Sequence, residues 1–219
     1  QNVLKDEGLD PNICQLGADV SAHLITKELA EHKDVKLIDY TGGSAFGNYI
    51  ESLSGKTVFT EKAGVNSCIL DSVADLKAVM QNISFSVSLY SGQMCTAPQN
   101  FFVPETGIET PEGNVSFDDF VGHLKKALSG IASHPKMGVG VLGAIQNDLT
   151  LERLNKVGDI GANVALASGA VDSPEFVKAR VGSASVLVVD GDKVETYEQE
   201  LFGPFVLVII TNSTEDSVA

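Results

Sequence analysis

The feature that most constrains the fold is the alternation of short apolar runs with amphipathic segments near the start of the chain. Residues 12–16 and 35–40 predict strands, and Asp19 can cap a helix over residues 20–31 between them. A strand, a helix and a second strand within about thirty residues are typical of a parallel unit with a right-handed crossover. The pattern therefore predicts an α/β fold.

A glycine turn follows the second of these strands. Thr41, Gly42, Gly43 and Ser44 lead into a predicted helix over residues 45–52. Ser44 can cap this helix, whose free N–H groups would favour an anion such as a pyrophosphate. Paired glycines are also ordinary turn chemistry between a strand and a helix, and the full Gly-x-Gly-x-x-Gly pattern is absent. Both interpretations stay open at this point.

A carboxylate comes at the end of the next predicted strand. Residues 56–60 run directly into Glu61, and a glycine follows at Gly64. Parallel-sheet proteins place their chemistry at such strand ends, although a solvated acid is also common there. The first set of alternating units ends near residues 60–65, where we predict a domain boundary.

One cysteine lies at a junction that suits a nucleophile. A predicted helix over residues 73–90 delivers the chain to Cys95, and the apolar strand predicted over residues 99–103 follows. A ligand and backbone N–H groups can approach a thiol closely at this junction, because Gly92 has no side chain. Most free cysteines are instead small buried apolar residues, so Cys95 alone does not decide between the two interpretations.

The second half of the chain alternates in the same way. The patterns predict helices over residues 117–131 and 147–156, a loop that includes residues 134–138, and strands over residues 163–167, 185–190 and 205–210. Long apolar strands of this kind are buried in α/β proteins.

Composition excludes several classes of partner. The net charge is −14 and lysine and arginine are not clustered, so nucleic acid and anionic membrane are not expected partners. Cys14, Cys68 and Cys95 are far apart and form no Cys-x-x-Cys pair, which indicates reduced thiols and no zinc framework. The four histidines lack metal-ligand spacing, so no metal site is expected. We expect a cytoplasmic protein, since no membrane span or signal peptide is visible.

Four short stretches occur in a fixed order: Tyr-Thr-Gly-Gly-Ser at 40–44, Glu-Lys-Ala-Gly at 61–64, Gly-Gln-Met-Cys at 92–95 and Glu-Leu-Phe-Gly-Pro at 200–204. Together they resemble the aldehyde dehydrogenase superfamily, which carries Phe-Thr-Gly-Ser, Glu-Leu-Gly-Gly, Gly-Gln-x-Cys and Glu-x-Phe-Gly-Pro in this order. The sequences of residues 60–66 and 89–96 are most similar to those of the phenylacetic acid degradation (PaaN-type) branch.

The resemblance implies an aldehyde-dehydrogenase-like α/β fold. Residues 1–60 would be the C-terminal half of a Rossmann-like NAD(P)-binding domain, and residues 61–219 a catalytic domain truncated at its C-terminus. The implied reaction oxidises an aldehyde or semialdehyde to the carboxylic acid with NAD or NADP, in phenylacetate degradation. The implied protein is longer than this chain and a homo-oligomer; the start at Gln1 and the end within a predicted helix also suggest a piece of a longer protein.

Residue roles carry over from the motifs. Cys95 resembles the nucleophile that forms a thiohemiacetal and then a thioester, and Glu61 resembles the general base that activates water for thioester hydrolysis. Residues 41–44 match the turn that contacts the cofactor. Glu200 resembles the residue that binds the nicotinamide ribose, and Phe202 packs beside it.

Several departures from the family pattern affect these roles. Gly43 falls where the family often has a phosphate-contacting serine, and Lys62 and Ala63 replace a leucine and a glycine. The family's oxyanion-hole asparagine would lie upstream of Gln1, so the chain alone is expected to be inactive. A coenzyme-A-acylating dehydrogenase and a non-catalytic domain that retains the fold are the alternatives, and Glu61 argues against the first.

Overall fold

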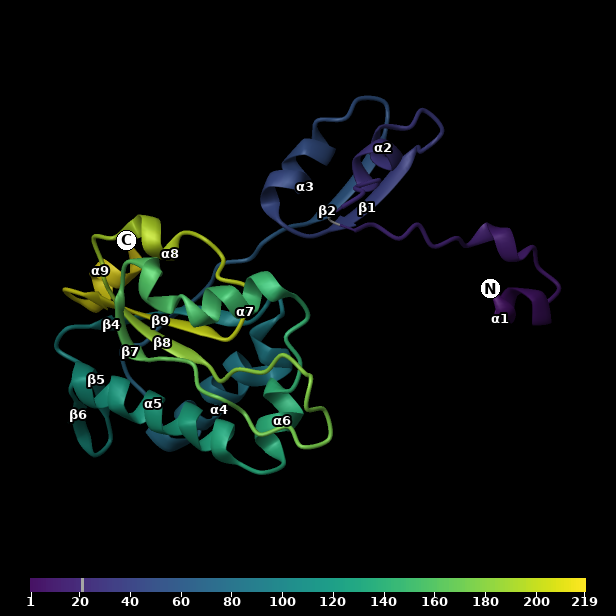
Figure 1. Cartoon of the computed structure of the whole chain (residues 1–219). Coiled ribbons are helices and arrows are strands. Elements are labelled where there is room, and N and C mark those ends of the chain that lie inside the picture. The colour runs from purple at the N-terminus through teal and green to yellow at the C-terminus, as the bar shows by residue number, and fades with distance from the viewer. Residues whose placement is uncertain (21) are drawn as a thin grey trace. The chain divides into compact units, whose positions relative to one another are not determined.

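The computed structural model describes residues 1–20 and 22–219. The chain forms two compact units, residues 1–63 and residues 64–219 (Figure 1). Within the described residues, no helix combines the length and the apolar character needed to span a bilayer.

The first unit is built on two parallel strands. Strand β1, Leu37–Thr41, pairs with β2, Thr57–Glu61, and helix α3, Ser44–Glu51, connects them. This is the strand-helix-strand crossover expected for an α/β chain, although it begins one strand later than predicted. The remaining elements of this unit are α1 at Asn2–Asp6, the 3₁₀ turn η1 at Pro11–Ile13 and α2 at Thr26–Glu31.

Two predictions in the first unit were wrong. Residues 12–16 form no strand, because Pro11 is suited to the first turn of a helix and the Asp10 carboxylate accepts a hydrogen bond from the N–H of Asn12 at 2.9 Å. The helix predicted over residues 20–31 begins only at Thr26, and residue 21 lies outside the described residues. The Asp19 carboxylate still accepts the Thr26 N–H at 2.9 Å, so it holds the start of this shorter helix.

Helix α3 also begins differently from the prediction. Gly43 is the capping position and Ser44 is already helical, with no hydrogen bond from its side chain to the helix end. The reason is that Gly43 adopts the extended backbone of a cap (φ −64°, ψ 147°), which moves Ser44 one position into the helix.

The second unit is a five-stranded sheet in the order β3-β4-β9-β8-β7. Neighbouring strands run parallel except at the edge, where β7 is antiparallel to β8. The predicted strands of this unit are all present, within a residue or two at their ends. The strands are β3 Asn66–Ile69, β4 Pro98–Pro104, β7 Asn163–Leu166, β8 Ser185–Asp190 and β9 Phe205–Thr211, and a separate hairpin pairs β5 Ile108–Thr110 with β6 Gly113–Val115.

Helices cover both faces of this sheet (Figure 1). Side chains alternate between the faces along each strand, so neighbouring buried residues enter different cores. The helical elements are α4 Leu76–Ser88, η2 Leu89–Gly92, α5 Phe117–Ser133, α6 Met137–Leu142, α7 Asp148–Asn155, η3 Val157–Ile160, α8 Val194–Tyr197 and α9 Thr214–Val218.

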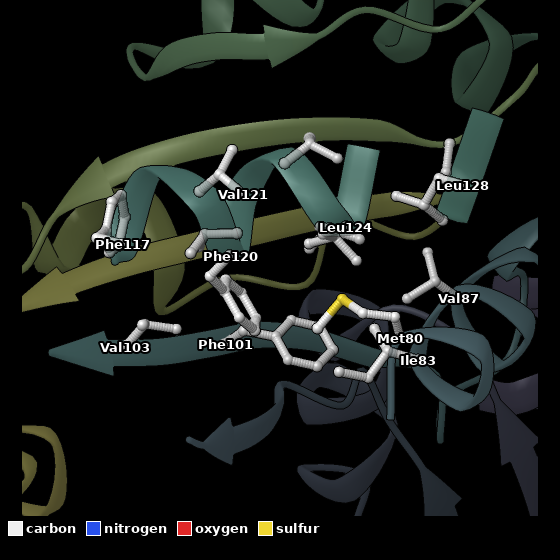
Figure 2. Packing of buried hydrophobic residues seen from close by; sticks show 14 of the residues in the cluster. Met80, Ile83, Val87, Phe101, Val103, Phe117, Phe120, Val121, Leu124 and Leu128 are labelled. Carbon is white, nitrogen blue, oxygen red and sulfur yellow. The ribbon is translucent and has the colours of Figure 1, made fainter. Parts of the chain in front are cut away.

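The larger core lies between the sheet and the pair α4 and α5. Phe101 and Phe120 meet there beside Met80, and all three side chains are buried (Figure 2). The second core lies on the opposite face, where Leu187 and Leu207 pack with residues of α7 and η3. A sheet filled on both faces is what the long apolar strands of the sequence predicted.

Two helices of the second unit differ from the sequence patterns. Helix α4 begins at Leu76, three residues later than predicted, because the Asp75 carboxylate caps it by accepting the Ala78 N–H at 2.9 Å. Helix α6 falls partly in the predicted loop. Its start is stabilised by His134, whose Nδ1 accepts the N–H of Met137 at 3.0 Å.

Candidate active site

The backbone that leads into Cys95 has an unusual conformation. After α4, Tyr90, Ser91 and Gly92 all have positive φ, at 52°, 56° and 63°. This left-handed conformation costs about 1–2 kcal/mol for each residue that carries a Cβ, and such outliers cluster at functional sites. The turn ends the helical run and directs the chain toward the thiol.

Gln93 fixes this turn to a distant segment. Its Nε2 donates to the carbonyl oxygens of Tyr90 at 3.0 Å and Ala144 at 2.7 Å, and its Oε1 accepts the Gln146 N–H at 2.8 Å. One side chain thus uses its donor and acceptor groups to join the loop that carries Cys95, the thiol loop, to the segment that precedes α7.

The thiol is exposed while its backbone is held. Cys95 is an exposed free cysteine, and its carbonyl oxygen accepts a hydrogen bond from Nδ2 of Asn66 at 2.7 Å. The same Asn66 nitrogen donates to the carbonyl of Ala97 at 3.1 Å. A Cβ on Gly64 would lie 2.4 Å from the Cys95 carbonyl oxygen, so only glycine permits this approach. The arrangement presents an exposed cysteine on a fixed loop.

The segment around Glu200 packs against the same loop. Oε1 of Glu200 accepts the Gly64 N–H at 3.3 Å, and Arg153 Nη1 donates to the Phe202 carbonyl at 2.8 Å. A Cβ on Gly92 would lie 2.4 Å from the carbonyl oxygen of Gly203, so these two glycine backbones are in direct contact. The structure therefore brings Glu200 and Phe202 next to the loop that carries the thiol.

A cavity of about 10 Å³ remains between these segments, which is about the room of one water molecule. Gly64, Met94, Glu200 and Phe202 are among the residues that line it. The segments that contain Gly64, Met94 and Glu200 are far apart in the sequence, but together they surround this one small space.

The remaining candidate residues lie together in the first unit. Thr41 and Glu61 are register partners at the ends of parallel strands β1 and β2, and the Gly42 N–H donates to the Glu61 carbonyl at 3.0 Å. The Glu61 residue is exposed. Tyr40 covers the turn, with its hydroxyl donating to the Gly43 carbonyl at 2.9 Å.

Lys62, which departs from the family pattern, has a defined place. Its Nζ donates to Asn48 Oδ1 and Glu51 Oε2, both at 2.9 Å. Its methylene groups occupy the position that a Cβ on Gly47 would need, 2.7 Å away. A hydrogen bond from the Thr60 hydroxyl, and then the contact with Lys62, lower the pKa of Glu51. Lys62 is therefore held along α3, beside the strand end that bears Glu61.

The sequence profile of the aldehyde dehydrogenase family matches residues 2–219. The chain belongs to the aldehyde dehydrogenase family. The superfamily resemblance and the aldehyde-dehydrogenase-like α/β fold are thereby confirmed.

Individual aldehyde dehydrogenases are similar along most of this chain. The crystal structure of an NAD-dependent aldehyde dehydrogenase from Burkholderia multivorans is 41% identical with a TM-score of 0.90, over 99% of this chain and 39% of that one. Betaine aldehyde dehydrogenase of Bacillus subtilis is 27% identical over 199 residues, 87% of this chain and 39% of the relative. The 2-hydroxymuconic semialdehyde dehydrogenase of Pseudomonas sp. strain CF600 is 30% identical over 190 residues, 80% of this chain and 36% of the relative. The chain thus spans less than half the length of these aldehyde dehydrogenases.

The sequence motifs missed several polar residues that organise this aldehyde dehydrogenase site. Asn66 and Arg153 were not singled out, and no pattern in the sequence marks them. Gln93 belongs to the Gly-Gln-Met-Cys stretch, but no role was assigned to it. Gln99 and Asn100 carry a detectable signal, because two adjacent amides stand at the start of an otherwise apolar strand. Among the described residues, no group of three or more histidine, cysteine or acidic side chains is arranged to hold a metal ion.

Proposed function

We propose that the whole protein oxidises an aldehyde or semialdehyde to its carboxylic acid with NAD or NADP. The observation that carries this proposal is the exposed thiol of Cys95 on a fixed backbone, beside Glu200 and Phe202, in a chain of the aldehyde dehydrogenase family. The relatives named above include NAD-dependent and semialdehyde dehydrogenases, which supports both parts of the proposal.

In this proposal the two parts of the chain have different roles. Residues 1–60 are part of a Rossmann-like cofactor domain, and residues 61–219 are most of the catalytic domain. The turn at residues 41–44 fits a phosphate-bearing cofactor, because it follows the carboxyl end of a parallel strand and a Cβ at Gly43 would meet nothing within 4 Å. Glu200 and Phe202 would hold the nicotinamide end. When bound, NAD or NADP supplies the hydride acceptor.

Residues of the chain itself carry out the other steps of the proposed reaction. The Cys95 thiolate attacks the aldehyde carbon, which forms a carbon–sulfur bond and gives a thiohemiacetal. After loss of hydride the acyl group is a thioester on the same sulfur. Glu61 takes a proton from a water molecule that attacks this thioester, which releases the acid and the thiol.

Finer parts of the proposal concern substrate and setting. We propose a semialdehyde from aromatic ring degradation, in the phenylacetic acid degradation branch, because of the wording of residues 60–66 and 89–96 and because one relative is a 2-hydroxymuconic semialdehyde dehydrogenase. We also propose a cytoplasmic protein, since three free cysteines suit a reducing compartment. We propose a homo-oligomer because the family resemblance implies one. The chain alone is proposed to be inactive.

Substitution of the thiol tests the reaction. In the whole protein, Cys95→Ala should lower NAD(P)-dependent aldehyde oxidation by at least about a thousandfold, the scale of losing a covalent nucleophile. Cys14→Ala, at another exposed free cysteine, is the matched control and should keep full activity. Aldehyde oxidation that persists in Cys95→Ala would refute the proposal.

A second variant separates the acid-forming reaction from transfer to coenzyme A. Glu61→Gln should accumulate an acyl thioester on Cys95, visible as an added mass on the peptide that contains it. If the unaltered protein converts the aldehyde to an acyl-coenzyme A product in the presence of coenzyme A, the acylating alternative is correct instead.

A further inference from the structure

Two adjacent amides are buried in the strand that follows the thiol loop. Gln99 and Asn100, on β4, are only 5% and 1% exposed. Burying an amide away from water is costly unless its donors and acceptors are paired. These two side chains must therefore have partners inside the protein, and the identity of those partners shows what they do.

The partners of Gln99 lie on both sides of Glu200. Its Oε1 accepts the Leu201 N–H at 2.6 Å, and its Nε2 donates to the Gln199 carbonyl at 3.0 Å. One side-chain amide thus pairs with the backbone groups just before and just after Glu200, as a neighbouring strand would. Gln99 therefore uses the backbone groups on either side of Glu200 and does not occupy the Glu200 side chain itself.

Asn100 orients this amide. Its Oδ1 accepts a hydrogen bond from Gln99 Nε2 at 3.0 Å, and its own Nδ2 donates to the Tyr197 carbonyl at 2.8 Å. The Tyr197 ring packs edge-on against Phe102, with centroids 5.5 Å apart. The segment before Glu200 is therefore anchored to β4 by a second amide and by an aromatic contact.

We propose that Gln99 is a positioning residue that sets the place of Glu200 relative to the thiol. Gln99 is four residues after Cys95, so the strand that fixes the thiol loop also fixes the Glu200 segment. Oε1 of Glu200 contacts Gly64, whose backbone packs on the Cys95 carbonyl, so the two groups are held within one unit. This inference rests on the proposed role of Glu200 in binding the cofactor.

Hydrogen exchange tests the positioning without any catalysis. Gln99→Met keeps the volume of the side chain but removes its hydrogen bonds, so exchange of the Leu201 N–H should accelerate by about tenfold. Gln81→Met makes the same change at an exposed site of α4 and should leave this exchange unchanged. Leu128→Ala removes volume from the core between the sheet and the pair α4 and α5, and should raise exchange throughout the unit and not selectively at residues 199–202. Unchanged Leu201 exchange in Gln99→Met would overturn the proposal.

Enzyme kinetics of the whole protein then test whether the placement of Glu200 by Gln99 affects cofactor binding. Gln99→Met should raise KM for NAD or NADP by about tenfold, while kcat at saturating cofactor stays within about twofold and iodoacetamide labels Cys95 at the normal rate. If Glu200→Gln raises this KM but Gln99→Met does not, the positioning proposal fails. If neither variant changes KM while Leu201 exchange still accelerates in Gln99→Met, the proposed cofactor role of Glu200 fails and the positioning of the segment stands.

Discussion

Replacing Gly92 with alanine should destabilise the second unit strongly. Gly92 has φ +63°, a conformation that costs an L-residue with a Cβ about 1–2 kcal/mol. The new methyl group would also lie 2.4 Å from the carbonyl oxygen of Gly203 and 2.6 Å from the Cα of Pro204. Both are backbone atoms that cannot rotate away, and overpacking of this kind costs about 1–3 kcal/mol. The expected total is therefore about 2–5 kcal/mol.

Thermal and urea denaturation followed by circular dichroism measure this loss. For a unit of this size, about 2–5 kcal/mol corresponds to a melting temperature lower by about 5–15 °C. Gly130→Ala is the matched control, because Gly130 is an exposed residue of α5 where a Cβ would meet nothing within 4 Å. That variant should be stabilised by about 0.5–1 kcal/mol. If Gly92→Ala melted within a degree or two of the unaltered protein, the inferred contact between Gly92 and Gly203 would be wrong.

Two further predictions concern titrating groups. Burial raises the pKa of the Cys68 thiol, so iodoacetamide near neutral pH should label Cys68 more slowly than the exposed Cys14 and Cys95, as followed by peptide mass spectrometry; equal rates would contradict the burial. The hydrogen bond from the Thr60 hydroxyl is the main cause of the lowered pKa of Glu51. The ionised Glu51 carboxylate therefore stabilises the folded unit above the unfolded pKa of about 4.3, and this stabilisation is lost as pH falls through the folded pKa. Thr60→Val should therefore lower the melting temperature of the first unit at neutral pH, and the difference should shrink below about pH 4; a difference independent of pH would refute this linkage.

Patterns within short stretches predicted the second unit well. Its long apolar strands appear where the sequence placed them, because a run such as residues 205–210 can be buried only in a sheet that is covered on both faces. The strand predicted at residues 12–16 is absent because no second strand among the described residues pairs with it. A strand needs a partner for its backbone groups, and local apolarity cannot show whether one exists.

The contacts that organise the candidate site could not be read from the sequence. Gln99 and Leu201 are about a hundred residues apart, and so are Gly92 and Gly203, so no local pattern reports their contact. The motif order predicts that Glu200 serves the same site as Cys95. That role stays a prediction, and the structure places the two segments together in the second unit. The role of Lys62 was missed, because its partners on α3 become neighbours only after the parallel crossover has formed.

The strand order of the second unit has a consequence for its synthesis. Strand β9 lies between β4 and β8, yet it follows the four other strands in sequence. Until residues 205–211 leave the ribosome, the pair β3-β4 and the pair β7-β8 have no strand to join them, and each exposes an unpaired apolar edge. Completing the sheet requires pairing of segments about a hundred residues apart, a slow step for any chain. Strand β4, which leads directly from the thiol loop, gains its second neighbour only then, so the site around Cys95 is among the last parts of the second unit to become ordered.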